Sequence, residues 1–228
     1  MLQFRPVDVH GQLGFLSGSV LCTGLLLCSA STPLALSGDS ADRTVAVAAA
    51  APKAAPETRA TIANGNEGGR YELTPERRAL LNTIRYAEGT WKDGKDKGYR
   101  IMYGGGQFKD LSRHPERVVV KRYASAAAGA YQFLPKTWKG VARELRLKSF
   151  EPRHQDQAAL HLAKRRGALG DIDQQGLTKD AMAKLAPEWA SFPNRSGRSA
   201  YGQPVKSHQD LARFYSENLQ ELRSQLGA

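Results

Sequence analysis

The chain has very little cysteine. Its 228 residues include two, Cys22 and Cys28, and both lie close to the N-terminus. If the segment that holds them is removed, the remaining protein has no thiol. That would exclude a disulfide framework, thiol catalysis and thiolate metal sites. A lipidated cysteine is disfavoured, because Leu21 and Leu27 stand where a small residue is expected before such a cysteine.

Long apolar runs are also scarce. Residues 13–27 (LGFLSGSVLCTGLLL) form an apolar stretch that is too short and too interrupted by glycine for a comfortable membrane span. Small residues follow, and residues 35–37 (ALS) fit a signal-peptidase site, with 29–31 as a second option. We therefore expect residues 1–37 to be a signal peptide or N-terminal apolar segment. The alternatives are an uncleaved anchor and a buried helix. Cleavage would give a secreted or periplasmic protein without a stable membrane span.

Large apolar side chains are almost absent between residues 38 and 70, where alanine, proline and glycine dominate. A segment of this composition cannot bury a core, so it is predicted to be a disordered linker. Residues 71–228 then form the folded domain.

Acidic residues are too few to balance the basic ones. The formal net charge is +11, and the first 69 residues contribute four basic and five acidic side chains, so the rest of the chain carries +12. This excess indicates an anionic partner, such as nucleic acid, an acidic membrane surface or an acidic polymer.

Helix start and stop signals dominate the folded part. Thr74 followed by Pro75 predicts a helix start, and Gly89 predicts its end. Further helices are expected at residues 134–147, at 153–166, after Thr178 and after Ser207. Residues 99–108 (YRIMYGGGQF) have the pattern of strand, tight turn and strand. The predicted fold class is α+β and mostly helical, with a small β-hairpin lobe beside a helical lobe.

One carboxylate is predicted to lie where its ionised form is disfavoured. Glu88 is four residues after Ile84 and seven after Leu81, so it projects from the apolar stripe of the first helix. It also lies in the last turn, where the helix dipole is negative. Both effects raise the pKa of a carboxyl group, and a general acid needs such a group. The pattern alone leaves open a solvated glutamate at a frayed helix end.

Five sequence fragments occur in an order that resembles a known family. They are YAEGT (86–90), GYRIMYGGGQFKDLSRHP (98–115), GAYQFLPKTW (129–138), RGAL (166–169) and EWASFP with YGQ (188–203). Together they resemble the endolysins of phage lambda type, which are lytic transglycosylases of the lysozyme superfamily. The resemblance covers about residues 74–217. It departs from the family at Ala130, where arginine is common, and in a longer loop before Tyr201.

The resemblance implies a lysozyme-like fold and assigns the catalytic acid to Glu88. It implies cleavage of the β-1,4 bond between N-acetylmuramic acid and N-acetylglucosamine, with a 1,6-anhydromuramic acid product. It also implies that Tyr131 and Gln132 line the saccharide groove, with Tyr201 and Gln203 as weaker candidates for the same wall. We expect a monomer that acts on peptidoglycan glycan strands without a cofactor or metal.

Three alternatives remain open from the residues. A hydrolytic lysozyme would need a second carboxylate, for which Asp93, Asp96 and Asp110 are available, although aspartate in loops commonly serves turns. A non-catalytic cell-wall-binding module would bind the same polymer without cleaving it. A nucleic-acid binder is disfavoured, because aromatic and basic residues do not alternate.

Trp138 is expected in the core, and Trp189 is ambiguous. The histidines have no metal-binding spacing.

Overall fold

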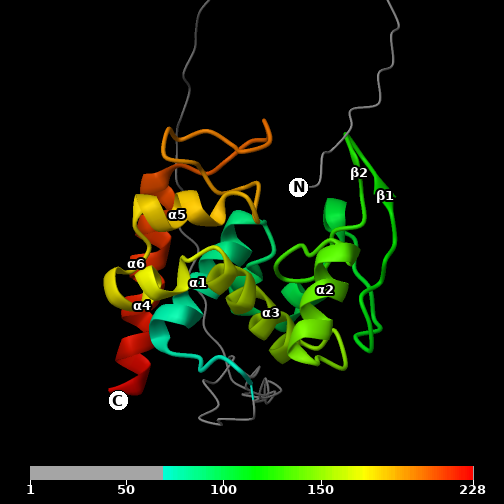
Figure 1. Ribbon diagram of the computed structural model, residues 1–228, viewed down its shortest axis with the longest axis horizontal. Helices are drawn as coiled ribbons and strands as arrows, with labels where there is room; N and C mark the ends of the chain where they lie inside the picture. Colours follow the sequence, from blue (N-terminus) through cyan, green and yellow to red (C-terminus); the bar gives the residue numbers. More distant parts are fainter. Residues whose placement is uncertain (1–68, 228) are drawn as a thin grey trace, which may run out of the picture. The chain divides into compact units, whose positions relative to one another are not determined.

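The computed structural model describes residues 69–227 (Figure 1). The predicted signal peptide (1–37) and all but the last two residues of the predicted linker (38–70) lie outside the described residues, so both stay predictions. Within residues 69–227, no helix combines the length and the apolar character that crossing a membrane requires.

α-Helices are the main regular structure of the described residues. They are α1 (Pro75–Ala87), α2 (Pro135–Leu145), α3 (Pro152–Arg165), α4 (Leu169–Gln175), α5 (Lys179–Leu185) and α6 (His208–Leu226). Short 3₁₀ turns follow α1, namely η1 (Lys92–Gly94), η2 (Asp96–Arg100) and η3 (Tyr103–Gly105). The predicted helices are confirmed to within one or two residues at most ends. Helix α4 was not predicted, because its sequence LGDIDQQ offers few apolar side chains, of which Leu169 and Ile172 are buried.

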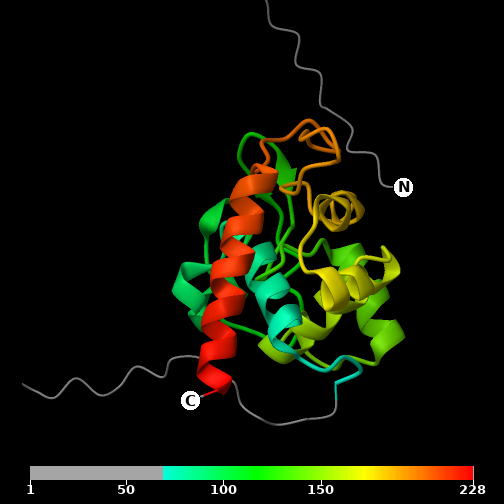
Figure 2. The ribbon, with the colours of Figure 1, turned by 90° about the vertical axis from the view of Figure 1, so that its left-hand side faces the viewer.

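Side-chain caps start the two helices that carry most of the helical lobe. The Thr74 side chain accepts a hydrogen bond from the Arg77 amide at the start of α1. The Ser207 side chain does the same for the Asp210 amide at the start of α6. Helix α6 runs beside α1, and the two helices pack along most of their lengths (Figure 2). These contacts bury the apolar stripe of α1 that ends at Glu88.

The β-hairpin lobe exists, but it lies at another place in the sequence. Strand β1 (Val119–Val120) pairs antiparallel with β2 (Ala124–Ser125), at the side of the molecule away from α6 (Figure 1). The prediction of two strands at residues 99–108 was wrong, since a single bridge joins Ile101 to Gln107 there. Gly104 and Gly105 both adopt positive φ and close a 3₁₀ turn, and Met102 pairs with Ala128 instead of extending a ladder.

Candidate active site

Glu88 lies at the C-terminal cap of α1, beside a loop from the far end of the sequence. The residue is partly exposed, and its carboxyl group is surrounded by protein atoms. The Ser191 hydroxyl donates a hydrogen bond to Glu88 Oε1 at 2.6 Å. Burial raises the pKa of Glu88 to about 7, and the Ser191 hydrogen bond acts in the opposite direction. The predicted direction of this pKa shift is therefore confirmed, and desolvation is its cause.

The turn after Glu88 is fixed by buried polar groups. Gly89 adopts φ 73°, which ends the helix, and the Thr90 amide returns to the Arg85 carbonyl at 2.8 Å. The buried Thr90 hydroxyl donates to the Ala130 carbonyl at 2.5 Å. This bond ties the chain after Glu88 directly to the loop that carries Tyr131 and Gln132.

That second loop, residues 129–133, is held by Gln155 of α3. The fully buried Gln155 side chain accepts a hydrogen bond from the Ala130 amide and donates to the carbonyls of Tyr99 and Phe150. Gly129 permits this approach. It adopts φ 82°, and a Cβ atom there would lie 2.3 Å from Gln155 Oε1. A side chain at this position would both strain the backbone and displace the amide that holds the loop.

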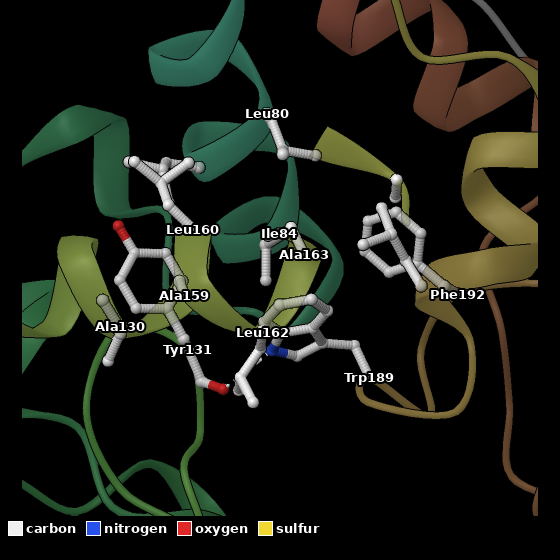
Figure 3. Close-up of a cluster of buried hydrophobic side chains, with 14 of the residues drawn as sticks. Leu80, Ile84, Ala130, Tyr131, Ala159, Leu160, Leu162, Ala163, Trp189 and Phe192 are labelled. Atoms are coloured by element: carbon white, nitrogen blue, oxygen red, sulfur yellow. Dashed lines mark hydrogen bonds between the residues drawn. The ribbon is translucent and has the colours of Figure 1, made fainter. Parts of the chain in front are cut away.

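The structure places the Tyr131 side chain in the core and not on a substrate-facing wall. It is 1% exposed, and its hydroxyl donates to Asp156, which also accepts from Tyr99 and pairs with Arg78. The predicted sugar contact of Tyr131 stays a prediction, and in this structure the backbone of the loop, not the buried side chain, would have to make it. The aromatic ring anchors the loop, and its phenol satisfies a buried carboxylate. The Tyr131 carbonyl accepts a hydrogen bond from the Trp189 indole at 3.1 Å (Figure 3).

Trp189 thereby links the Tyr131 loop to the segment that carries Ser191. Trp189 and Phe192 are both buried, and they lie on either side of Ser191 in the sequence. Both pack in the hydrophobic cluster that Ile84 of α1 also joins (Figure 3). The ambiguity over Trp189 is resolved in favour of the core.

The other predicted binding residues lie on loops with partial or full exposure. Gln132 is half-buried, and its side-chain nitrogen donates to the carbonyls of Ile101 and Gly129. Tyr201 is 43% exposed, and its hydroxyl donates to the Pro187 carbonyl at 2.7 Å. Gln203 is half-buried in the same loop. The end of this loop is joined to the segment next to Glu88, because the Lys206 amide donates a hydrogen bond to the Ser191 carbonyl.

The endolysin family model matches residues 78–222. This chain belongs to the endolysin family. The endolysin of Escherichia phage lambda is 37% identical over 138 residues, which cover 58% of this chain and 84% of the phage protein. The endolysin of Escherichia phage P2 is 33% identical over 147 residues, which cover 58% and 86%.

Solved structures agree with this assignment. The bacteriophage lambda lysozyme complexed with a chitohexasaccharide matches with a TM-score of 0.59 and 34% identity, over 65% of this chain and 96% of that one. A second lysozyme structure from bacteriophage lambda matches with a TM-score of 0.56 and 32% identity, over 67% and 96%. The lysozyme-like α+β fold is confirmed, and the chain is a lysozyme-like glycosidase of the peptidoglycan-cleaving class.

The aspartates considered as a second carboxylate in this endolysin-family chain lie on exposed loops. Asp93, Asp96 and Asp110 are all exposed, and Asp110 accepts a hydrogen bond from the Ser112 amide within its own turn. Within residues 69–227, burial raises the pKa of Glu88 and the hydrogen bond from Ser191 lowers it. The same residues contain no cluster of three or more histidine, cysteine or acidic side chains that would hold a metal ion.

Several residues that build the candidate site were not predicted from the sequence. Thr90 and Ser191 both lie inside the sequence fragments that resemble the family, but no local pattern shows the hydrogen-bond partner of either residue. Gln155 and Asp156 are polar residues buried in the middle of α3. Consecutive polar residues within a buried helix indicate a hydrogen-bond network, because buried polar groups require partners.

Proposed function

We propose that the chain is a lytic transglycosylase in which Glu88 is the general acid and then the general base. The observation that carries this proposal is a partly exposed residue whose carboxyl group has its pKa raised by burial to about 7. Such a group is substantially protonated near neutral pH and can donate a proton to a glycosidic oxygen. The bond would be the β-1,4 linkage between N-acetylmuramic acid and N-acetylglucosamine.

The proposed reaction needs one carboxyl group and no activated water. Glu88 protonates the glycosidic oxygen, and the bond from C1 of N-acetylmuramic acid to that oxygen breaks. The 6-hydroxyl of the same sugar attacks C1, and the Glu88 carboxylate takes the proton that this hydroxyl loses. The product is a 1,6-anhydro sugar. Because the nucleophile belongs to the substrate, proximity replaces the second carboxylate of a hydrolytic enzyme.

The environment of Glu88 supports this one-carboxyl route over hydrolysis. In a retaining or inverting hydrolase, a second carboxylate lies within roughly 5–10 Å of the acid. The aspartates weighed for that role, Asp93, Asp96 and Asp110, are exposed loop residues, and Asp110 accepts a hydrogen bond within its own turn.

We further propose that Gln132, Tyr201 and Gln203 contact the glycan strand. Amide and phenol groups suit N-acetyl sugars, which combine hydrogen-bonding groups with an apolar ring face. The lambda lysozyme bound to a chitohexasaccharide supports a glycan ligand for the fold. The +12 charge downstream of residue 69 would retain a monomeric enzyme on an anionic wall polymer in the cell envelope.

Two measurements test the proposed function. Glu88→Gln should lower the release of soluble muropeptides from purified sacculi by about 10²- to 10⁴-fold, the usual contribution of a general acid. Glu217→Gln, an exposed change on α6, should leave the release unchanged. Mass spectrometry of the products should show muramic acid ends that lack one water molecule.

Two results would contradict this proposal. Products that retain the water would identify a hydrolytic lysozyme. Wild-type activity in Glu88→Gln would overturn the assignment of Glu88.

A further inference from the structure

The contact between Ser191 and Glu88 joins two parts of the chain that are 103 residues apart in sequence. The Ser191 hydroxyl lies 2.6 Å from Glu88 Oε1, which is short for a hydrogen bond and typical of a charge-assisted one. It is also the one side-chain hydrogen bond that shifts the pKa of Glu88 within residues 69–227.

The backbone around Ser191 is held from several sides. Trp189 binds the Tyr131 carbonyl, and the Phe192 amide donates to the Trp189 carbonyl at 2.9 Å. The Lys206 amide donates to the Ser191 carbonyl at 3.2 Å. The Ser191 hydroxyl therefore belongs to a segment whose backbone is fixed by the buried side chains of Trp189 and Phe192.

We infer that Ser191 is a positioning residue for Glu88, which fixes one carboxyl oxygen and favours the ionised form after the proton has been transferred. This inference rests on the proposed function of Glu88. A hydroxyl donor stabilises a carboxylate more strongly than it stabilises a neutral acid. Burial alone favours the neutral acid. The two influences together keep both protonation states accessible, as a group that acts first as an acid and then as a base requires.

The charged groups around Glu88 have other partners. On α1, the Arg85 guanidinium donates to the carbonyls of Trp91 and Lys95. In the segment after α5, Glu188 pairs with Arg166.

The remaining titratable groups on neighbouring elements are also engaged. The Lys206 ammonium lies over the Tyr86 ring and 4.0 Å from Asp210 of α6, and the Tyr86 hydroxyl donates to the same aspartate. The Tyr131 hydroxyl is bound to Asp156. Ser191 is thus the group whose removal changes the balance at Glu88 most directly.

The test compares three serine variants. Ser191→Ala removes the donor, and Ser191→Thr retains a hydroxyl at the same position. Ser216→Ala is the matched control, because this exposed hydroxyl lies on α6 and donates to the Ala212 carbonyl. Two readouts are measured between pH 5 and pH 9: the rate of muropeptide release, and the pKa of Glu88 from the ¹³C shift of its carboxyl carbon. The Glu88 resonance is assigned by its absence in Glu88→Gln.

In Ser191→Ala, the pKa of Glu88 and the basic limb of the pH–rate profile should both move up by about one pH unit, with a lower maximal rate. Ser191→Thr should restore the wild-type limb, and Ser216→Ala should not change it. A lower rate without movement of the limb would show a merely structural role and overturn the inference. If Glu88→Gln is fully active, the proposed function fails, and that result is read independently of the serine variants.

Discussion

Replacing Glu88 by glutamine should stabilise the protein, and the gain should depend on pH. The pKa of Glu88 rises from its ordinary 4.5 to about 7 in the folded chain. The folded state therefore binds this proton more tightly than the unfolded state, and its stability falls as pH rises from 4.5 to 7. With about 1.4 kcal/mol per pH unit, the buried charge costs about 3 kcal/mol above pH 7 and nothing below pH 4.5. Glutamine has a similar shape, can still accept the Ser191 hydrogen bond, and does not ionise.

The assay is urea or thermal unfolding of wild type and Glu88→Gln at pH 4, 6 and 8, with Glu217→Gln as an exposed control. The difference in free energy of unfolding between Glu88→Gln and wild type should grow by about 3 kcal/mol from pH 4 to pH 8. For a domain of this size, that corresponds to about 6–12 °C in Tm. A difference that is the same at all three pH values would refute the claim that burial disfavours the ionised Glu88.

Two further predictions concern the loop beside Glu88. Tyr131→Phe removes the hydroxyl that donates a hydrogen bond to the buried Asp156. This change should lower the free energy of unfolding by about 1–3 kcal/mol and leave KM unchanged. A raised KM with unchanged stability in steady-state and urea measurements would instead place this side chain on the substrate. Gly129→Ala puts a methyl group 2.3 Å from Gln155 Oε1 at φ 82°, so it should cost several kcal/mol, measured by urea unfolding, and reduce muropeptide release. Wild-type stability and activity in this variant would contradict the role given to the loop geometry.

Features with a local cause were predictable from the sequence. The starts of α1, α5 and α6 follow from Thr74, Thr178 and Ser207, each of which caps the helix with its own side chain. The strands were misplaced because the sequence around Gly104 and Gly105 is typical of a hairpin turn. In the structure, Met102 pairs instead with Ala128, which lies outside that turn. A local pattern of alternation cannot show which distant segment will complete a ladder.

The same distinction explains the predictions for the site. The helical spacing of Glu88 from Ile84 and Leu81 shows which face it shares, but this pattern left a solvated glutamate open, and the resemblance to the endolysins is what singled out Glu88. Tyr131 and Tyr201 have the same side chain, and nothing close to either in sequence shows that the first reaches a buried aspartate while the second is 43% exposed. Ser191 could not be assigned for a related reason. Its partner is 103 residues away, and the packing of Trp189 and Phe192 brings the two together.

The raised pKa of Glu88 and the rigidity of its surroundings depend on each other. An ionised carboxylate can escape desolvation if the chain around it opens to water, and its pKa then returns towards the ordinary value. Thr90 bonds the turn after Glu88 to Ala130, and Gln155 holds Ala130 to α3, so opening the site breaks buried hydrogen bonds on both sides. A cost of about 3 kcal/mol is a large part of the 5–15 kcal/mol that usually separates folded and unfolded states. The buried hydrogen bonds of Thr90 and Gln155 therefore do more than stabilise the fold, because they also keep the carboxyl group of Glu88 in a desolvated environment.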